Sequence, residues 1–474
     1  MIKLDKTVMF FIIGVALFQS WTAYVLPIRG DEAFLILKST NNSWGTIPYV
    51  GLGESLISIF SYFGENVFTL RIPAIILLSL SLGLIYKMAS ALGGAKAGWF
   101  ATITFAVIPS VSFAYTSVTP NGLFIFFAVA SIYGWYRGLL EKSGKHYTAA
   151  MISSVAAFLT HASGIFFVFI PFLYLLVRRD LLEDKKFMVN ALIGIILMAL
   201  VIVVNLLGYI DVLHTYPVKD TDPMIKRLLL LSLSFFPSII VIAHLFIRRN
   251  IFLKDTTFFN IMFFMTNIAA LILISFMDYD MRNLGAFMVP SAILVGFIFS
   301  KSESVTKYLI SAIIIGLFIY SAGTALYIKN TYVPSYIHGT RVFETLKYPI
   351  DKVLNVGKAV FSRDPLFSSI ISIHVNHKPE ACTIASCSST SGVFISNKKE
   401  KNLDKYFDNV LESGTYRITS IDSGNAQFYF YDVMGIKENY SNKKFNNSNE
   451  LFFNDEVLDN DSLNNDKKLE NSNG

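Results

Sequence analysis

Residues 8–26 read VMFFIIGVALFQSWTAYVL, and PIRGDE follows at residues 27–32. The first stretch is apolar and has about the 20 residues that a helix needs to cross roughly 30 Å of hydrocarbon. Two adjacent carboxylates, Asp31 and Glu32, therefore stand where the chain leaves the membrane. Charge at a membrane face is costly and rarely lacks a function, and a carboxylate there can take a proton from a hydroxyl nucleophile. This short region is a candidate active site.

The composition indicates a polytopic membrane protein. Of 474 residues, 53% are hydrophobic and only 16% are charged, and the mean hydropathy is +0.51. A soluble core of this size needs far less apolar sequence. The net charge of +6 does not indicate nucleic-acid binding, because the Lys and Arg residues are spread over short loops rather than gathered in a patch.

Further apolar runs bring the predicted number of membrane spans to about eleven. The block 147–177 is too long for one span, and Gly164 and the small polar residues before it weaken a helix. We therefore expect two short helices there, broken around residues 160–164. The remaining runs lie near residues 67–90, 98–116, 120–140, 187–209, 227–247, 256–276, 284–300 and 307–328.

The basic residues predict the orientation. Lys3 and Lys6 precede the first span, and no small-x-small cleavage pattern ends it, so we expect a retained span with a cytoplasmic N-terminus. Every loop then predicted to be cytoplasmic is basic, as the positive-inside rule requires, whereas the outer loops are acidic or mixed. An odd number of spans places everything after Asn330 outside. The basic loops hold residues 87–96, 137–145, 178–186, 248–254 and 301–307.

Two amphipathic stretches in the first outer loop are too short to span a membrane. We expect residues 31–38 (DEAFLILK) and 52–63 (LGESLISIFSYF) to form helices that lie in the interface. Such helices can roof a cavity that opens sideways to lipid. A lipid-linked substrate needs an entrance of that kind.

The composition changes after residue 330. We expect a mainly α membrane domain over residues 1–330 and a small extracytoplasmic α/β domain over residues 331–436. Residues 437–474 are rich in Asn, Asp, Ser and Lys and have few apolar side chains to offset the ordering entropy, so we expect a disordered polar tail.

Local patterns predict elements inside the small domain. The stretches 415–421 and 427–433 flank a turn-rich tetrapeptide and predict a β-hairpin, and the amphipathic stretch 401–412 predicts a helix. The two cysteines of the chain, Cys382 and Cys387, also fall here. On the oxidising side of a membrane they can close a small loop, and two free thiols are the equal alternative. A lone pair is a poor metal site.

Several short motifs stand at the predicted outer face. They are Arg29-Gly30-Asp31-Glu32-Ala33, Trp44-Gly45, Phe63-Gly64, Leu70-Arg71-Ile72-Pro73-Ala74, Thr119-Pro120-Asn121, Leu159-Thr160-His161 and Met281-Arg282-Asn283. Their order and spacing over residues 8–300 resemble the GT-C glycosyltransferases of the protein-mannosyltransferase and aminoarabinose-transferase superfamily. Those enzymes use polyprenyl-phosphate sugars.

The resemblance implies an inverting transfer with Asp31 as catalytic base and Glu32 beside it as the second catalytic residue. An acceptor hydroxyl attacks the anomeric carbon while a polyprenyl phosphate leaves, and cationic groups stabilise that phosphate. No cofactor is chemically required, and a metal is not predicted. The candidates for binding the donor phosphate are Arg282, His161, Lys219 and Arg227, with Lys226 beside the last. The residues expected to line the substrate cavity are Tyr49, Glu54 and Asn121.

Two positions depart from the family pattern. Tyr49-Val50-Gly51 replaces a basic residue followed by two prolines, and Asn121 replaces an acidic residue. These departures leave open an altered sugar, an altered acceptor or an inactive relative.

The candidate residues also have structural explanations. Asp31 can cap the interfacial helix, and Glu32 can complement its dipole. Arg71 can snorkel to the interface. His161 can be a hydrogen-bonded histidine of the bundle, and Arg282 can pair with neighbouring aspartates.

Together these patterns predict a bacterial inner-membrane glycosyltransferase that acts at the outer face. The acceptor is an envelope glycolipid or glycan, with protein as the second choice. A transporter or lipid flippase is the main alternative, but the sequence shows no clear internal repeat, and its charges cluster at the outer face rather than at mid-membrane depth. A non-catalytic assembly factor explains the small outer domain but not the position of Asp31-Glu32.

Overall fold

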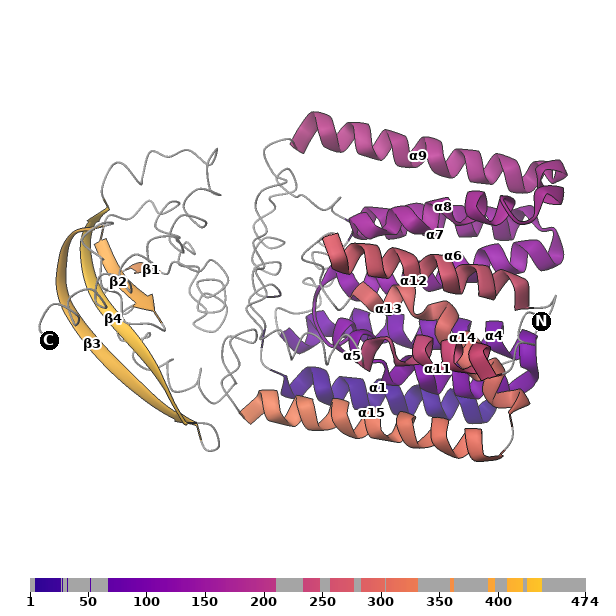
Figure 1. Ribbon diagram of the computed structural model, residues 1–474. Helices are drawn as coiled ribbons and strands as arrows, with labels where there is room; N and C mark the ends of the chain where they lie inside the picture. Colours follow the sequence, from indigo (N-terminus) through magenta and orange to yellow (C-terminus); the bar gives the residue numbers. More distant parts are fainter. Residues whose placement is uncertain are drawn as a thin grey trace, which may run out of the picture.

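A computed structural model describes most of the membrane domain and four strands beyond it. The described residues are 5–26, 28, 32, 52, 67–209, 233–247, 256–276, 283–302, 304–330, 359–361, 391–396, 407–420 and 424–436. Among them, helices fill the range up to residue 330 and strands follow it, as the change in composition predicts (Figure 1).

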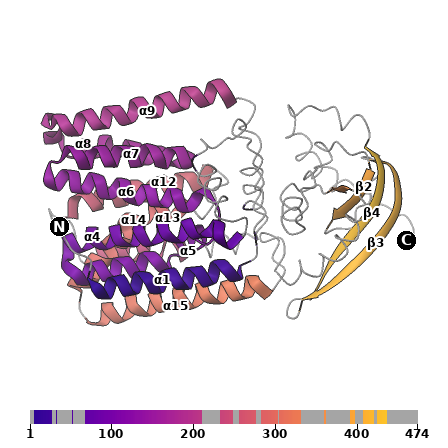
Figure 2. The ribbon, with the colours of Figure 1, turned by 180° about the vertical axis from the view of Figure 1, so that it is seen from behind.

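The helices form a bundle whose rods lie side by side (Figures 1 and 2). Their bounds are α1 (Lys6–Val25), α4 (Val67–Val107), α5 (Pro109–Ala114), α6 (Pro120–Glu141), α7 (Gly144–Thr160), η1 (Ala162–Gly164), α8 (Ile165–Leu175), η2 (Arg179–Glu183), α9 (Lys185–Tyr209), α11 (Phe236–Ile247), α12 (Thr257–Phe276), α13 (Leu284–Phe287), α14 (Val289–Lys301) and α15 (Ser304–Asn330). We call the end of the bundle that faces the strands the sheet end, and the opposite end the N-terminal end.

Helix α4 is two rods joined by a tight turn. Gly93 leaves the helical region, and Gly94 has φ +77°, a left-handed conformation that favours glycine. The second rod returns along the first, because a Cβ on Gly98 would stand 2.7 Å from the Tyr86 ring. The turn therefore separates the predicted spans 67–90 and 98–116.

The predicted break in the block 147–177 is confirmed. Helix α7 ends at Thr160, His161 is extended, and α8 begins at Ile165 after the short helix η1. A Cβ on Gly164 would stand 2.2 Å from the backbone nitrogen of Phe158, so the chain can turn this closely only at a glycine. The small residue at 164 thus permits the reversal as well as weakening the helix.

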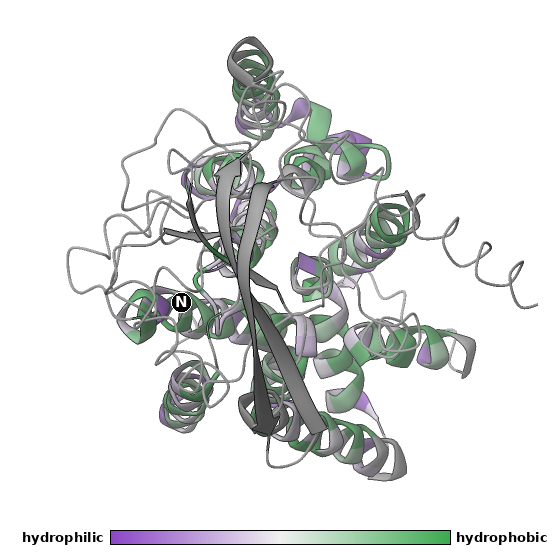
Figure 3. Cartoon of the chain, turned by 90° about the vertical axis from the view of Figure 1, so that its left-hand side faces the viewer, coloured by the Kyte–Doolittle hydropathy of each residue, from purple (hydrophilic) through white to green (hydrophobic). Residues whose placement is uncertain are grey.

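The described helices have the apolar character of membrane spans. Helices α1, α4, α6, α9 and α12 are long and apolar enough to cross a membrane, and shorter apolar helices occur in α8, α11, α14 and α15. Large apolar side chains such as Phe10, Ile196 and Ile319 are exposed on the outside of the bundle, where a soluble protein would place polar groups. Figure 3 shows how widely hydrophobic residues cover the helices. The chain is a membrane protein, and the number of eleven crossings stays a prediction.

Helix α14 is the centre of the bundle. Every residue from Val289 to Phe299 is buried, and the helix contacts α4, α11, α12 and α15. Gly296 lets α4 approach closely, because a Cβ there would stand 2.3 Å from the backbone oxygen of Ala97 and 2.8 Å from the Ala101 side chain. Small residues at such crossings allow the van der Waals contact that holds membrane helices together.

The strands form one sheet in the order β1-β2-β4-β3. The bounds are β1 (Ala359–Phe361), β2 (Ser391–Ser396), β3 (Phe407–Ser420) and β4 (Gly424–Ile436). Strands β3 and β4 pair antiparallel from Phe407↔Ile436 to Ser420↔Gly424, which confirms the predicted hairpin. Phe394 of β2 is buried, and its ring lies 6.3 Å from that of Tyr431 of β4, centroid to centroid.

The predicted helix over 401–412 is wrong for the residues that the structure describes. Residues 407–412 belong to β3, where Asn409 pairs with Met434 and Glu412 with Asp432. A register shift between Val410 and Glu412 interrupts the two-residue alternation, so the apolar positions imitate a helical period. Pairing with β4 decides the conformation, because strand propensity depends on the neighbouring strand.

Several predictions lie outside the described residues. These are the two interfacial helices, apart from Glu32 and Leu52, which are both helical, together with the cysteine pair and the tail over 437–474. The domain boundaries at 330 and 436 also stay predictions.

The close crossing of α4 and α14 can be tested at one glycine. We expect Gly296→Ala to lower the free energy of unfolding by about 1–3 kcal/mol, because the added methyl overpacks the contact with Ala97 and Ala101. Gly316→Ala on α15 is the matched control, since nothing lies within 4 Å of its Cβ position and alanine favours a helix. Thermal unfolding in detergent measures both, and equal unfolding temperatures would contradict the packing.

Candidate active site

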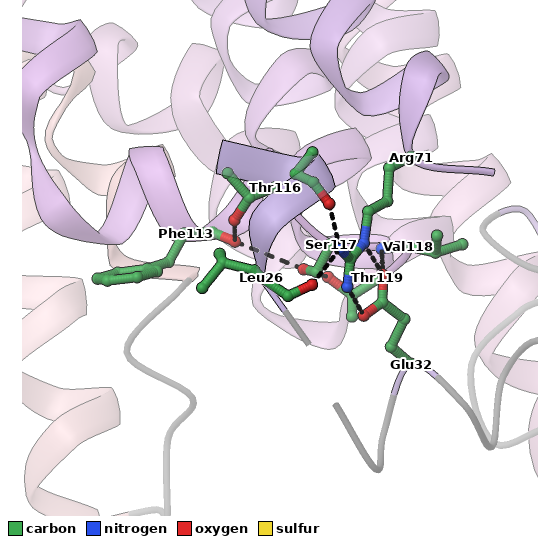
Figure 4. Close-up of polar contacts among 9 residues, drawn as sticks. Leu26, Glu32, Arg71, Phe113, Thr116, Ser117, Val118 and Thr119 are labelled. Atoms are coloured by element: carbon green, nitrogen blue, oxygen red, sulfur yellow. Dashed lines mark hydrogen bonds and ion pairs between the residues drawn. The ribbon is translucent and has the colours of Figure 1, made fainter. Parts of the chain in front are cut away.

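A buried ion pair stands at the sheet end of the bundle, directly beside the predicted catalytic position. Nη2 of Arg71 lies 2.6 Å from Oε2 of Glu32, and Nε donates to Oε1 at 2.7 Å. The two side chains are 3% and 0% exposed. This two-pronged geometry suits a planar guanidinium and a carboxylate, and Figure 4 shows the two groups facing each other.

Arg71 also ties the pair to the end of α1. Its Nη1 donates to the backbone oxygen of Leu26 at 2.9 Å and to that of Ala23. Carbonyls in the last turn of a helix lack partners within the helix, and a cation there is favoured by the helix dipole. The guanidinium therefore caps the end of α1 at the point where the chain leaves this helix.

Glu32 in turn holds the loop between α5 and α6. Oε1 accepts the backbone N–H of Val118 at 2.7 Å. The neighbouring hydroxyls of Ser117 and Thr119 lie 3.1 Å apart, and Ser117 also donates to the oxygen of Phe113 (Figure 4). The Glu32–Arg71 pair thus joins the start of α4, the end of α1 and the segment that leads into α6.

The position of Arg71 explains why it is buried. It lies on the same face of α4 as Ile75, Leu78 and Leu82, all of which are buried. The prediction that Arg71 snorkels to the interface is wrong, because its charge is satisfied inside the protein. A cation in register with an apolar stripe is the sequence signal that could have revealed a buried pair.

Glu32 has a structural task that the sequence alone did not indicate. Both of its carboxylate oxygens accept from Arg71, and one of them also accepts the backbone N–H of Val118. The carboxylate is therefore engaged by the protein on both oxygens. We therefore assign Glu32 as a positioning residue, and the residue before it, Asp31, lies outside the described part of the chain.

A second polar cluster lies at the break between α7 and α8. Nδ1 of His161 accepts the backbone N–H of Ser163 at 3.2 Å and lies 2.7 Å from its hydroxyl, while Nε2 lies 2.9 Å from the side-chain nitrogen of Asn283. The ring also packs against Phe124, with centroids 5.2 Å apart. His161 is thus a hydrogen-bonded histidine of the bundle, which was its structural alternative. A role in binding phosphate stays a prediction.

Both clusters contact residues at or just before the start of α6. Val118, which Glu32 holds, precedes that helix, and Phe124, which contacts His161, lies about one turn beyond its first residue, Pro120. Asn121 lies between them and is buried. Its role in a substrate cavity stays a prediction.

The remaining predicted site residues lie outside the described part of the chain. They are Tyr49, Glu54, Lys219, Lys226, Arg227 and Arg282. Among the residues that the structure does describe, no group of three or more His, Cys, Asp or Glu side chains is placed to hold a metal ion. The need for a metal therefore stays untested.

The fold matches known glycosyltransferase structures. ArnT from Cupriavidus metallidurans bound to undecaprenyl phosphate is similar with a TM-score of 0.58 and 13% identity, over 90% of this chain and 98% of that chain. The apo state of ArnT gives a TM-score of 0.59 and 12% identity over 90% and 97% of the two chains. Arabinosyltransferase EmbB from Mycobacterium smegmatis matches 63% of this chain and 31% of its own, with a TM-score of 0.46 and 11% identity.

Sequence comparison points the same way. Residues 52–204 match the family model described as dolichyl-phosphate-mannose-protein mannosyltransferase. No curated protein matches the chain by sequence. Together with the ArnT structures, the family model confirms the predicted resemblance, and the chain has the GT-C fold.

The buried ion pair makes a prediction about stability. We expect Arg71→Met to lower the free energy of unfolding by about 3–5 kcal/mol, because it leaves the Glu32 carboxylate buried without its cation. The measurement is thermal unfolding of the purified protein in detergent.

Arg178→Met is the control at the N-terminal end. Arg178 donates to both oxygens of Asp180 at 2.8 and 2.7 Å and lowers the pKa of that carboxyl, but both side chains are exposed. Water can replace the lost partner, so we expect little change. Equal losses of unfolding free energy in the two variants would show that burial of the Arg71 pair contributes nothing to stability.

Proposed function

We propose that this chain, which has the GT-C fold, is a membrane glycosyltransferase that moves a sugar from a polyprenyl-phosphate donor to an acceptor hydroxyl, with inversion. The observation that carries the proposal is the buried Glu32–Arg71 pair at the sheet end of the bundle. It fixes the residue next to Asp31 against α1, α4 and the segment before α6. The chemistry of the donor is supported by the match to ArnT, which was solved with undecaprenyl phosphate.

The proposed reaction is one displacement. The Asp31 carboxylate takes the proton of the acceptor hydroxyl, and the oxygen attacks the anomeric carbon. The bond from that carbon to the phosphate oxygen breaks, and the electron pair leaves with the polyprenyl phosphate. A positioned general base contributes about 10²–10⁴-fold to such a rate.

The leaving phosphate needs positive charge or hydrogen-bond donors around it. We propose Arg282, Lys219 and Arg227 as the cations, with His161 at the edge of the site, and Tyr49, Glu54 and Asn121 as residues that line the cavity. A metal is not required, because the phosphate remains on its lipid and protein groups can neutralise its charge.

We place the site at the outer face of a bacterial inner membrane. The described ends of helices at the N-terminal end of the bundle are rich in basic residues, as expected of a cytoplasmic face. They are Lys87, Lys96, Lys142, Lys145, Arg178, Arg179, Lys185, Lys186 and Lys301. The acceptor on the outer face is then an envelope glycolipid or glycan, and a protein is the second choice.

The two other function classes have less support. The family model and the EmbB match are both described as transferases, and nothing in the comparisons supports a transporter or flippase. An assembly factor without catalysis gives no reason to bury an ion pair next to Asp31.

The proposal can be tested at Asp31. In a strain that lacks the gene, we expect mass spectrometry of envelope glycolipids and glycans to show a missing sugar, which the wild-type gene restores. Asp31→Asn should fold and reach the membrane but lose transfer by about 10²-fold or more, because the amide cannot accept the proton.

Asp180→Asn is the matched control, since this exposed carboxylate pairs with Arg178 at the N-terminal end. We expect it to restore the sugar fully. Restoration by Asp31→Asn to the same level would refute the assigned base, and an unchanged glycan profile in the deletion strain would refute the transferase.

A further inference from the structure

Asn283 has a buried amide that its protein neighbours do not satisfy. The residue is 1% exposed, and its side-chain oxygen has no hydrogen-bond partner in the described structure. Its nitrogen lies 2.9 Å from Nε2 of His161. A buried polar atom without a partner is destabilising, so native proteins usually satisfy it with water or a ligand.

The partners of His161 decide which amide atom faces the ring. The backbone N–H of Ser163 donates to Nδ1, and a backbone amide cannot act as acceptor in its place. A neutral imidazole that accepts at Nδ1 carries its proton on Nε2. The group opposite Nε2 must then be an acceptor, which is the oxygen of Asn283.

This orientation leaves the amide NH₂ of Asn283 as the unsatisfied group. Side-chain oxygen and nitrogen are assigned from their hydrogen-bond partners, and here the partners favour the oxygen toward His161. The freed nitrogen brings two donors and no acceptor. A ligand that meets them must offer oxygen lone pairs, as a phosphate or a sugar hydroxyl does.

The backbone beside Asn283 is held firmly. Helix α13 starts at the next residue, and a Cβ on Gly285 would stand 2.8 Å from Ile125 of α6 and 2.8 Å from Val111 of α5. Gly285, two residues after Asn283, therefore packs between α5 and α6, the helices on either side of the loop that Glu32 contacts. Arg282, the first proposed cation for the donor phosphate, is its neighbour in the chain.

We propose that Asn283 is a binding residue for the donor, and that its NH₂ group donates to an oxygen of the polyprenyl-linked phosphate while His161 holds the amide in place. This inference rests on the proposed function. It also changes the assignment of His161, which becomes a positioning residue because both ring nitrogens face protein partners.

The test measures how undecaprenyl phosphate raises the unfolding temperature of the purified protein in detergent, with undecaprenol as the uncharged probe. We expect the wild type to be stabilised by the phosphate but not by the alcohol. Asn283→Asp keeps an acceptor for His161 but replaces the donor by an anion, and Asn283→Ala removes the amide. Both should weaken phosphate binding by about 10-fold or more, the factor for one hydrogen bond to a charged group.

The matched control is Asn190→Asp. Asn190 accepts from Thr148 and donates to the backbone oxygen of Lys186, so its amide is satisfied, and it lies near the start of α9 at the N-terminal end. We expect this variant to keep the phosphate response. If a folded Asn283 variant keeps the full response, the inference fails and the proposed function stands. If the wild type shows no response to the phosphate, both fail.

Discussion

A charge removed from water must be satisfied by the protein, and the Glu32–Arg71 pair meets this requirement through contacts that join four parts of the chain. The carboxylate accepts from Arg71 and from the backbone of Val118, and the guanidinium reaches the last turn of α1. Such a pair is stable only when its remaining hydrogen bonds are also made. The cost of an unmatched charge therefore holds Glu32, the end of α1, the start of α4 and the segment before α6 in one arrangement. Asp31 is the residue before Glu32 in the chain.

The bundle provides a rigid support for this arrangement. Gly296 brings α14 against α4, Gly98 lets the two rods of α4 pack together, and Gly164 permits the reversal after α7. In lipid, helices gain little from the hydrophobic effect, so close packing at small residues holds them in place. The ion pair and the cluster of His161 and Asn283 both border the start of this bundle's helix α6, through Val118 and Phe124.

The sequence predicted features that depend on local chemistry. The length of the apolar runs predicted the helices. Gly164 indicated the break after Thr160, and the turn residues near Gly424 predicted the hairpin. Prediction from the sequence failed where a residue far along the chain determines the local structure. Arg71 pairs with a residue 39 positions away, which periodicity does not report, and residues 407–412 become a strand because β4 lies beside them. The pairing of Asn283 with His161 spans 122 positions and was missed for the same reason. The motifs did place both of those residues at the predicted outer face.

The ion pair fixes Glu32 at the sheet end of the bundle, and there we expect the neighbouring Asp31 to meet the donor. A cryo-EM structure of the chain bound to undecaprenyl phosphate tests this most directly. We expect the lipid phosphate to lie at the sheet end, beside Asp31, while Glu32 remains bound to Arg71 and Val118. A phosphate bound at the N-terminal end, or a Glu32 that has left Arg71 to contact the ligand, would contradict it.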